Sequence, residues 1–170
     1  MKQFILMLLL VAISGCTQHT YLKPNGKIGF VSTNGCGTLP NWFIYEDRNS
    51  RYSVSVYRDA LFLDVEVLEK DDVRWANDTI NVTIDGEKHS FRAKELMKYG
   101  VLRSPCGGFA ERLNCKQHQR YNIWIEIPNV ESAEIVVVDP PIPAVNGEPI
   151  GVSRIEFRPI TETLFSGINC

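Results

Sequence analysis

No apolar run in this sequence is long enough to cross a membrane as a helix. The longest, residues 4–13, falls well short of the roughly 20 residues that a bilayer core of about 30 Å requires. A basic block is missing too, since 18 Lys and Arg stand against 20 Asp and Glu, a formal net charge of −2. Without such a block, nucleic acid is not an expected partner.

Familiar catalytic and metal-binding motifs are also absent. The sequence has no G-x-S-x-G elbow, no H-E-x-x-H pair and no phosphate-cradling glycine loop. None of its five cysteines has a C-x-x-C neighbour, the spacing typical of zinc sites. We therefore expect no metal, no cofactor and none of these common enzyme activities.

What the sequence does have is a short leader. Lys2 places a positive charge ahead of the apolar residues 4–13, which is typical of a signal peptide. The next residues, Ile13, Ser14, Gly15 and Cys16, resemble the lipobox of bacterial lipoproteins. An ordinary cleaved signal peptide that ends near a cysteine by coincidence is the alternative.

The lipobox resemblance implies diacylglycerol on the Cys16 sulfur, cleavage before Cys16 and acylation of the new amino terminus. Several acyl chains such as palmitate, each contributing about 0.8 kcal/mol per buried CH₂, anchor a protein durably to the membrane. Thr17 rather than aspartate follows the cysteine, which resembles the outer-membrane sorting pattern of enterobacterial lipoproteins. The expected location is the outer membrane of a bacterium, facing the periplasm.

Assigning Cys16 to lipid leaves four cysteines in an oxidising compartment, and an even number favours two disulfides. Three pairings are possible. We expect Cys106 to pair with Cys115 across a short loop, and Cys36 with Cys170, which would tie the last residue to the start of the domain. The competing interpretation is a thiol nucleophile at Cys106 with His118 as its base.

Apolar and polar residues alternate with period two over most of the remaining chain, which indicates strands. The pattern is clearest at 53–57, 61–68, 80–84, 121–127 and 152–157, with shorter strands expected at 28–33, 41–45 and 135–138. Asp85-Gly86 predicts a tight hairpin that places His89 opposite Val82, as a packed edge residue rather than a ligand. Helix formers followed by Gly100 predict one short helix at 93–99.

These elements predict an all-β fold: an antiparallel β-sandwich of immunoglobulin-like architecture, with about seven strands and one short helix. A small closed barrel is the competing architecture. The expected organisation is a signal peptide at 1–15, lipidated Cys16 and a flexible tether over 16–27, and a single sandwich domain over 28–170. Prolines at 142–150 indicate a turn or blunted edge hairpin. The tail, which follows the strand at 152–157, is expected to run across the surface to Cys170.

Two sets of side chains are candidates for function. Asp64 and Glu66 share one face of a strand and would suit an acid and base pair, although two solvated carboxylates are the ordinary outcome. Exposed aromatics often anchor protein interfaces. The candidates are Trp42, Tyr45, Tyr57, Trp75 and Trp124, and the alternative for each is coverage by the opposing sheet or a loop.

The sequence thus predicts a lipid-anchored periplasmic binding module that is not an enzyme and has a protein as its partner. Within that class, an immunity or inhibitor role against an envelope-acting protein needs only a stapled scaffold and a complementary surface. One alternative is a periplasmic hydrolase or carbohydrate-binding protein with an unrecognised site, and another is a structural or assembly lipoprotein of the envelope. A deep cleft with convergent carboxylates or His118 would favour the enzyme, whereas a flat aromatic patch would favour the binding module.

Overall fold

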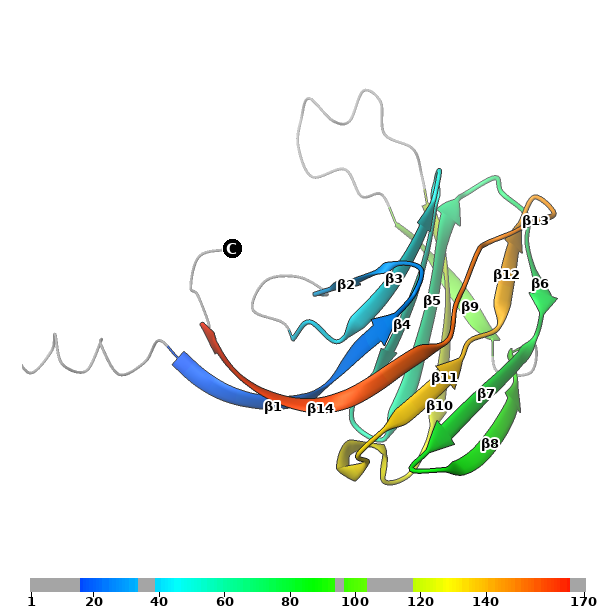
Figure 1. Ribbon diagram of the computed structural model, residues 1–170. Helices are drawn as coiled ribbons and strands as arrows, with labels where there is room; N and C mark the ends of the chain where they lie inside the picture. Colours follow the sequence, from blue (N-terminus) through cyan, green and yellow to red (C-terminus); the bar gives the residue numbers. More distant parts are fainter. Residues whose placement is uncertain (1–15, 34–38, 94–96, 104–117, 166–170) are drawn as a thin grey trace, which may run out of the picture.

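The computed structural model in Figure 1 describes residues 16–33, 39–93, 97–103 and 118–165. Strands dominate these residues, and the one short 3-10 turn among them is Val130–Ser132. The strands of the described residues are β1 Cys16–Gly26, β2 Phe30–Ser32, β3 Trp42–Asp47, β4 Ser50–Val56, β5 Ala60–Leu68, β6 Val73–Asn77, β7 Thr79–Ile84, β8 Glu87–Arg92, β9 Met97–Arg103, β10 His118–Glu126, β11 Val136–Asp139, β12 Ile142–Val145, β13 Glu148–Pro149 and β14 Ile155–Phe165.

Three antiparallel sheets are formed by the strands in the described part of the chain. The large sheet has the order β2-β3-β4-β5-β10-β9, the ribbon sheet β1-β14-β11-β7-β8, and the small sheet β13-β12-β6. The predicted antiparallel β-sandwich is confirmed. The strand number is higher than predicted, because short edge strands such as β6 and β13 lack the long alternation by which strands are recognised in a sequence.

A single apolar core joins the large sheet to the ribbon sheet. Alternate residues of β4 and β5 point inward, for example Val54 and Leu63, and meet Val82, Val136 and Phe157 from the other layer. Each of these side chains is buried. Since strand residues alternate between faces, the residues between them point away from the core and form the outer face of the large sheet.

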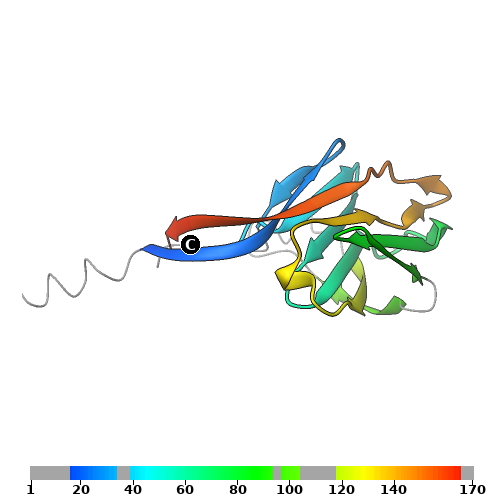
Figure 2. The ribbon, with the colours of Figure 1, turned by 60° about the horizontal axis from the view of Figure 1, so that its bottom comes forward.

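The amino-terminal segment is a strand rather than a tether. β1 pairs with β14 along its whole length, from Cys16 opposite Phe165 to Gly26 opposite Ile155. Figure 2 shows this pair reaching beyond the sandwich as a two-stranded arm. The prediction of a tether is therefore wrong for residues 16–26. The tail predicted to cross the surface is strand β14 as far as Phe165, and residues 166–170 lie outside the described part.

Polar composition explains this error. Tyr21 and Leu22 are buried, but most other described residues of β1 are exposed and polar, so apolar alternation is weak. Cross-strand contacts supply the order instead: the Tyr21 hydroxyl donates to Glu162 at 2.8 Å, and Lys23 Nζ lies 2.9 Å from the same carboxylate. A partner strand more than a hundred residues away leaves no local signal in the sequence.

The helix predicted at 93–99 is wrong for its last three residues, which belong to strand β9, while residues 94–96 lie outside the described part. Pairing of β9 with β10 overrides the local helix propensity, as tertiary context often does. The predicted hairpin is confirmed: Val82 lies opposite His89, and Asp85 and Gly86 both have positive φ. The prolines at 142–150 do form a short hairpin, β12 with β13.

Candidate functional site

The outer face of the large sheet carries an aromatic row that crosses four strands. Trp42 on β3, Ser55 on β4, Phe62 on β5 and Trp124 on β10 are successive cross-strand partners. The rings of Phe62 and Trp124 stack, with centroids 5.8 Å apart and an interplanar angle of 16°. Trp124 is 54% exposed, the largest exposure among the large hydrophobic residues in the described part.

A polar row runs beside the aromatic row. Ser53, Asp64 and Asn122 are successive cross-strand partners on β4, β5 and β10, and Phe30 with Ile44 extends the same row to β2 and β3. Phe30 is 45% exposed, so exposed aromatic rings lie near both sides of the outer face.

The two rows enclose a shallow depression of about 380 Å³, called here the aromatic groove. Trp42, Phe62 and Trp124 line it on the aromatic side, and Asp64, Arg120 and Asn122 line it on the polar side. Such a groove offers an apolar wall and hydrogen-bonding groups to the same ligand.

A third row alternates in charge. Glu46, Arg51, Glu66 and Arg120 are cross-strand partners on β3, β4, β5 and β10. Opposite charges directly across a sheet are favourable neighbours, so this order stabilises the strand register.

Diagonal ion pairs link this third row to its neighbours. Arg120 Nε donates a hydrogen bond to Asp64 Oδ1, although the backbone partner of Arg120 is Glu66. His118 Nδ1 lies 3.1 Å from Glu66 Oε1 in the same diagonal sense. The hydrogen bond to Asp64 raises the pKa of Arg120, outweighing the opposite effect of its burial. Both carboxylates are thus engaged by a cationic or ionisable side chain of β10.

Three buried polar atoms on this face have no hydrogen-bond partner among the described residues: Arg51 Nε, Ser55 Oγ and His118 Nδ1, which lies near Glu66 without a hydrogen bond to it. The acid paired with Arg51 is Glu46, at 3.9 Å, which is beyond hydrogen-bond distance. Arg51 also lines a second cavity of about 60 Å³, called here the polar hollow, which shares Trp42, Asp64 and Arg120 with the aromatic groove. Unsatisfied buried donors are uncommon in folded proteins and indicate a place where a ligand can add acceptors.

The predicted interface aromatics fall into different places. Trp42 and Trp124 come together on the outer face, as the hypothesis of an aromatic interface requires. Tyr57 is exposed but lies at the end of the sandwich, with the Arg58 guanidinium 5.1 Å from its ring centroid. The prediction is wrong for Tyr45, which is 1% exposed and donates to the Ser153 carbonyl at 2.6 Å, and Trp75 is half-buried against the core.

Asp64 and Glu66 share a strand face as predicted, but the expected solvation is wrong for Asp64, while Glu66 is partly exposed. Asp64 is 6% exposed, and neighbouring rows on β4 and β10 flank both carboxylates. Sequence reasoning missed Phe62, Arg51 and Arg120, because their importance depends on cross-strand register. The alternation of Asn122 and Trp124 with Ile123 was visible in the sequence, and Arg120 continues it by one step.

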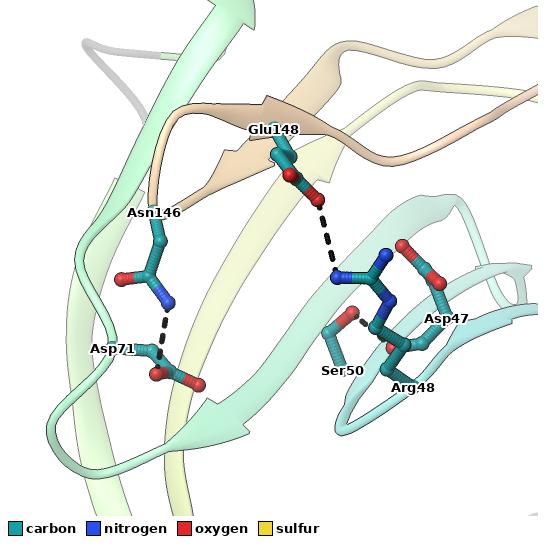
Figure 3. Close-up of polar contacts among 6 residues, drawn as sticks. All are labelled: Asp47, Arg48, Ser50, Asp71, Asn146 and Glu148. Carbon is teal, nitrogen blue, oxygen red and sulfur yellow. Dashed lines mark hydrogen bonds and ion pairs between the residues drawn. The ribbon is translucent and has the colours of Figure 1, made fainter.

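A separate cavity of about 260 Å³ lies at the turns between strands, and Figure 3 shows its polar contacts. Asn146 Nδ2 donates to Asp71 Oδ1 at 3.0 Å, and the Asp72 backbone N–H donates to Asn146 Oδ1 at 3.0 Å. Arg48 reaches Glu148 at 3.4 Å, with both side chains largely exposed. The Asn146 contacts hold the β12–β13 turn against the β5–β6 connection, and the Arg48 contact links β13 to the β3–β4 turn, so their role is structural.

The four cysteines of the predicted disulfides, Cys36, Cys106, Cys115 and Cys170, lie outside the described residues, and so does the signal peptide. For Cys16 the structure describes the backbone alone, at the start of β1. Among the described side chains, His, Cys, Asp and Glu nowhere gather in a group of three suited to a metal ion. No helix within the described ranges has the length and apolar character needed to span a membrane.

Comparisons with protein-family models, curated proteins and solved structures gave no match. The geometry of the outer face is therefore the basis on which a function is proposed.

Proposed function

We propose that this chain is a lipid-anchored, non-enzymatic binding module of the bacterial cell envelope. The observation that carries the proposal is the outer face of the large sheet, where Trp42, Phe62 and Trp124 lie in one row beside polar groups. Concentrated Trp and Arg side chains on an accessible surface are typical of binding sites. The lipid on Cys16 would attach this surface to the outer membrane, facing the periplasm.

Binding is favoured over catalysis by how the acids of the face are used. Asp64 accepts a hydrogen bond from Arg120, and Glu66 lies 3.1 Å from His118. A hydrolase needs one carboxyl group whose pKa is poised for proton transfer, at a site that shields the reacting atoms from water. Paired carboxylates beside an open, shallow groove fit recognition better.

A protein is the partner that the sequence predicts, with an immunity or inhibitor role. Exposed Phe30 and Trp124 would give it two anchors on one face, on strands β2 and β10. These strands are four positions apart in the sheet, about 19 Å at the usual strand spacing.

Carbohydrate recognition is a second candidate, and a specific observation favours it. Stacked aromatic rings stand next to Asp64, Arg120 and Asn122, which offer hydrogen-bond donors and acceptors in a shallow groove. Sugars present apolar C–H faces and polar hydroxyl edges together, which this juxtaposition matches.

Two experiments test the proposal. Mass spectrometry of the mature amino-terminal peptide should give a lipidated Cys16, and an unmodified Cys16 would remove the anchor from the proposal.

Capture from envelope extract with the full mature chain should recover a stoichiometric partner, and Trp124→Ala should reduce the recovery at least tenfold. Tyr57→Ala is the matched control, because Tyr57 is exposed but lines neither the aromatic groove nor the polar hollow. Equal recovery with both variants would contradict a role for this face.

A further inference from the structure

Charge pairing on the outer face argues against an ionic ligand. Asp64 is paired with Arg120, Glu66 with His118, and Glu46 lies 3.9 Å from Arg51. Each charged side chain of the groove and hollow therefore has a neighbour of opposite or ionisable character. An ion entering the site would compete with these pairs rather than fill a vacancy.

Hydrogen-bonding capacity nevertheless remains unused there. Arg51, which lines the polar hollow, has no hydrogen-bond partner for its Nε–H among the described residues. The exposed Asn122 amide lines the aromatic groove beside it. A neutral group with hydroxyl or carbonyl oxygens can satisfy such donors without disturbing the ion pairs.

The aromatic row supplies the complementary apolar contact. Aromatic faces carry negative charge density, so they attract the weakly positive C–H hydrogens of an apolar ring edge or face. Phe62 and Trp124 stack on each other, and Trp42 on β3 lines the same side of the groove, with Ser55 of β4 between it and Phe62 in the row. A ligand with one C–H-rich face and one hydroxyl-rich edge would use both rows at once.

The two cavities are adjacent and differ in size. The aromatic groove, about 380 Å³, has room for a six-membered ring, and the adjoining polar hollow, about 60 Å³, has room for a single substituent. Because they share Trp42, Asp64 and Arg120, a ring in the groove can direct a hydroxyl or hydroxymethyl group toward Arg51.

We propose that the aromatic groove and the polar hollow together bind an uncharged pyranose unit of a polysaccharide or oligosaccharide. This inference rests on the proposed binding function and names the ligand class of the same face. The site stays open to solvent on the outer face, so neighbouring sugar units of a chain can extend from it. A protein occupant is less well matched, since Asp and Glu are depleted at protein interfaces, whereas here Asp64 lines the groove and Glu66 lines the hollow.

The test titrates the full mature chain with four neutral tetrasaccharides: those of β-1,4-linked N-acetylglucosamine, β-1,4-linked glucose, α-1,4-linked glucose and β-1,4-linked mannose. Binding is followed by calorimetry and by saturation-transfer NMR, up to about 10 mM sugar, the range in which weak single-site binding is still measurable. At least one sugar should bind. Phe62→Ala and Trp124→Ala should each weaken that binding at least tenfold, and Tyr57→Ala should leave it unchanged.

Second variants separate recognition from folding. Asn122→Ala removes an exposed amide from the polar side of the groove and should weaken binding several-fold while circular dichroism and the unfolding midpoint stay constant. Tetragalacturonate, which carries a carboxylate on each ring, should bind no better than the neutral sugars.

Failure of this inference is distinguishable from failure of the proposed function. If no tetrasaccharide binds, or if Trp124→Ala binds as well as the wild type, the carbohydrate inference is overturned. The binding function still stands in that case if Trp124→Ala reduces recovery of a protein partner from envelope extract. If neither sugar binding nor partner recovery depends on Trp124, both proposals fail.

Discussion

Arg120 on β10 donates to Asp64 on β5, one step away from Glu66, its partner in the backbone register. His118 repeats the same diagonal step toward Glu66, although its backbone partner is Leu68. The β5–β10 pairing is therefore reinforced by side chains as well as by the sheet. This arrangement also sets the polar wall of the aromatic groove, because Asp64 and Arg120 both line it.

Removing the acid of this pair should destabilise the protein strongly. Asp64→Ala leaves the Arg120 guanidinium largely buried without its main acceptor, which should cost about 3 kcal/mol in the free energy of unfolding. Asp139→Ala is the control, since its pair with Arg154 is more exposed and solvent-screened, so its removal should cost clearly less than that of Asp64. Urea unfolding of both variants checks this, and equal losses would contradict the structural role of the Asp64–Arg120 pair.

The β7–β8 hairpin turn depends on a glycine. Gly86 has φ +93°, a conformation that L side chains rarely adopt, although open space surrounds the position of an added Cβ. Gly86→Ala should therefore lower the free energy of unfolding by about 1 kcal/mol through backbone strain alone. Gly151→Ala, also in open space but without positive φ, should leave stability unchanged or raise it slightly. Chemical denaturation compares the free energies of unfolding of the two variants. Similar changes in both would refute the proposed backbone strain at position 86.

Alkaline pH should weaken the core through Tyr45. Burial raises the pKa of Tyr45 to about 12, despite the opposing hydrogen bond to Ser153. The unfolded chain releases this proton near pH 10, so the stabilisation is intact below about pH 10 and is lost as pH rises toward 12. The loss amounts to about 2 to 3 kcal/mol for two pKa units.

Tyr45→Phe provides the comparison. It should cost about 1 kcal/mol at neutral pH, because the hydrogen bond to the Ser153 carbonyl is lost. Its stability should then fall less steeply than that of the wild type between about pH 10 and 12. Urea midpoints measured across this range test the idea, and parallel curves for the two proteins would show that Tyr45 does not titrate as described.

The β1–β14 arm contains an acid whose pKa is lowered. Hydrogen bonds from Lys23, and then from Tyr21, hold the pKa of Glu162 below its usual value. The stabilisation is present above the usual carboxylate range and is lost as pH falls through the lowered pKa, so arm amides should exchange faster in acid. Lys23→Met should raise the pKa of Glu162, whereas Lys27→Met, outside the paired strands, should not. A carboxyl-carbon NMR titration measures the pKa of Glu162. An unchanged Glu162 pKa in Lys23→Met would contradict the contact between Lys23 and Glu162.

Much of the sandwich was predictable because its strands alternate strongly. Val54 and Leu63 sit in patterns of period two, and Asp85-Gly86 fixes the register of one hairpin. The arm was not predictable, since β1 is polar and pairs with a segment far away in sequence. Strand β9 was mistaken for helix because local propensity at Met97 carries no information about pairing with β10.

The candidate site was predicted residue by residue but not as a unit. Trp42, Asp64, Glu66, His118 and Trp124 each stood out in the sequence for a separate reason, and the register places them on one face. Tyr45 was misassigned because an aromatic-rich strand gives no sign of which face is covered. Only the pairing of β3, β4, β5 and β10 reveals the rows.

Site-specific photo-crosslinking in intact cells tests the central claim, that the outer face of the large sheet binds the partner. A benzophenone amino acid placed at position 124 should form a covalent adduct with a protein or glycan when the cells are irradiated. The same amino acid at position 57, which is exposed but lines a different cavity, should form none. Adducts from position 57 alone, or no adduct from position 124, would contradict the account.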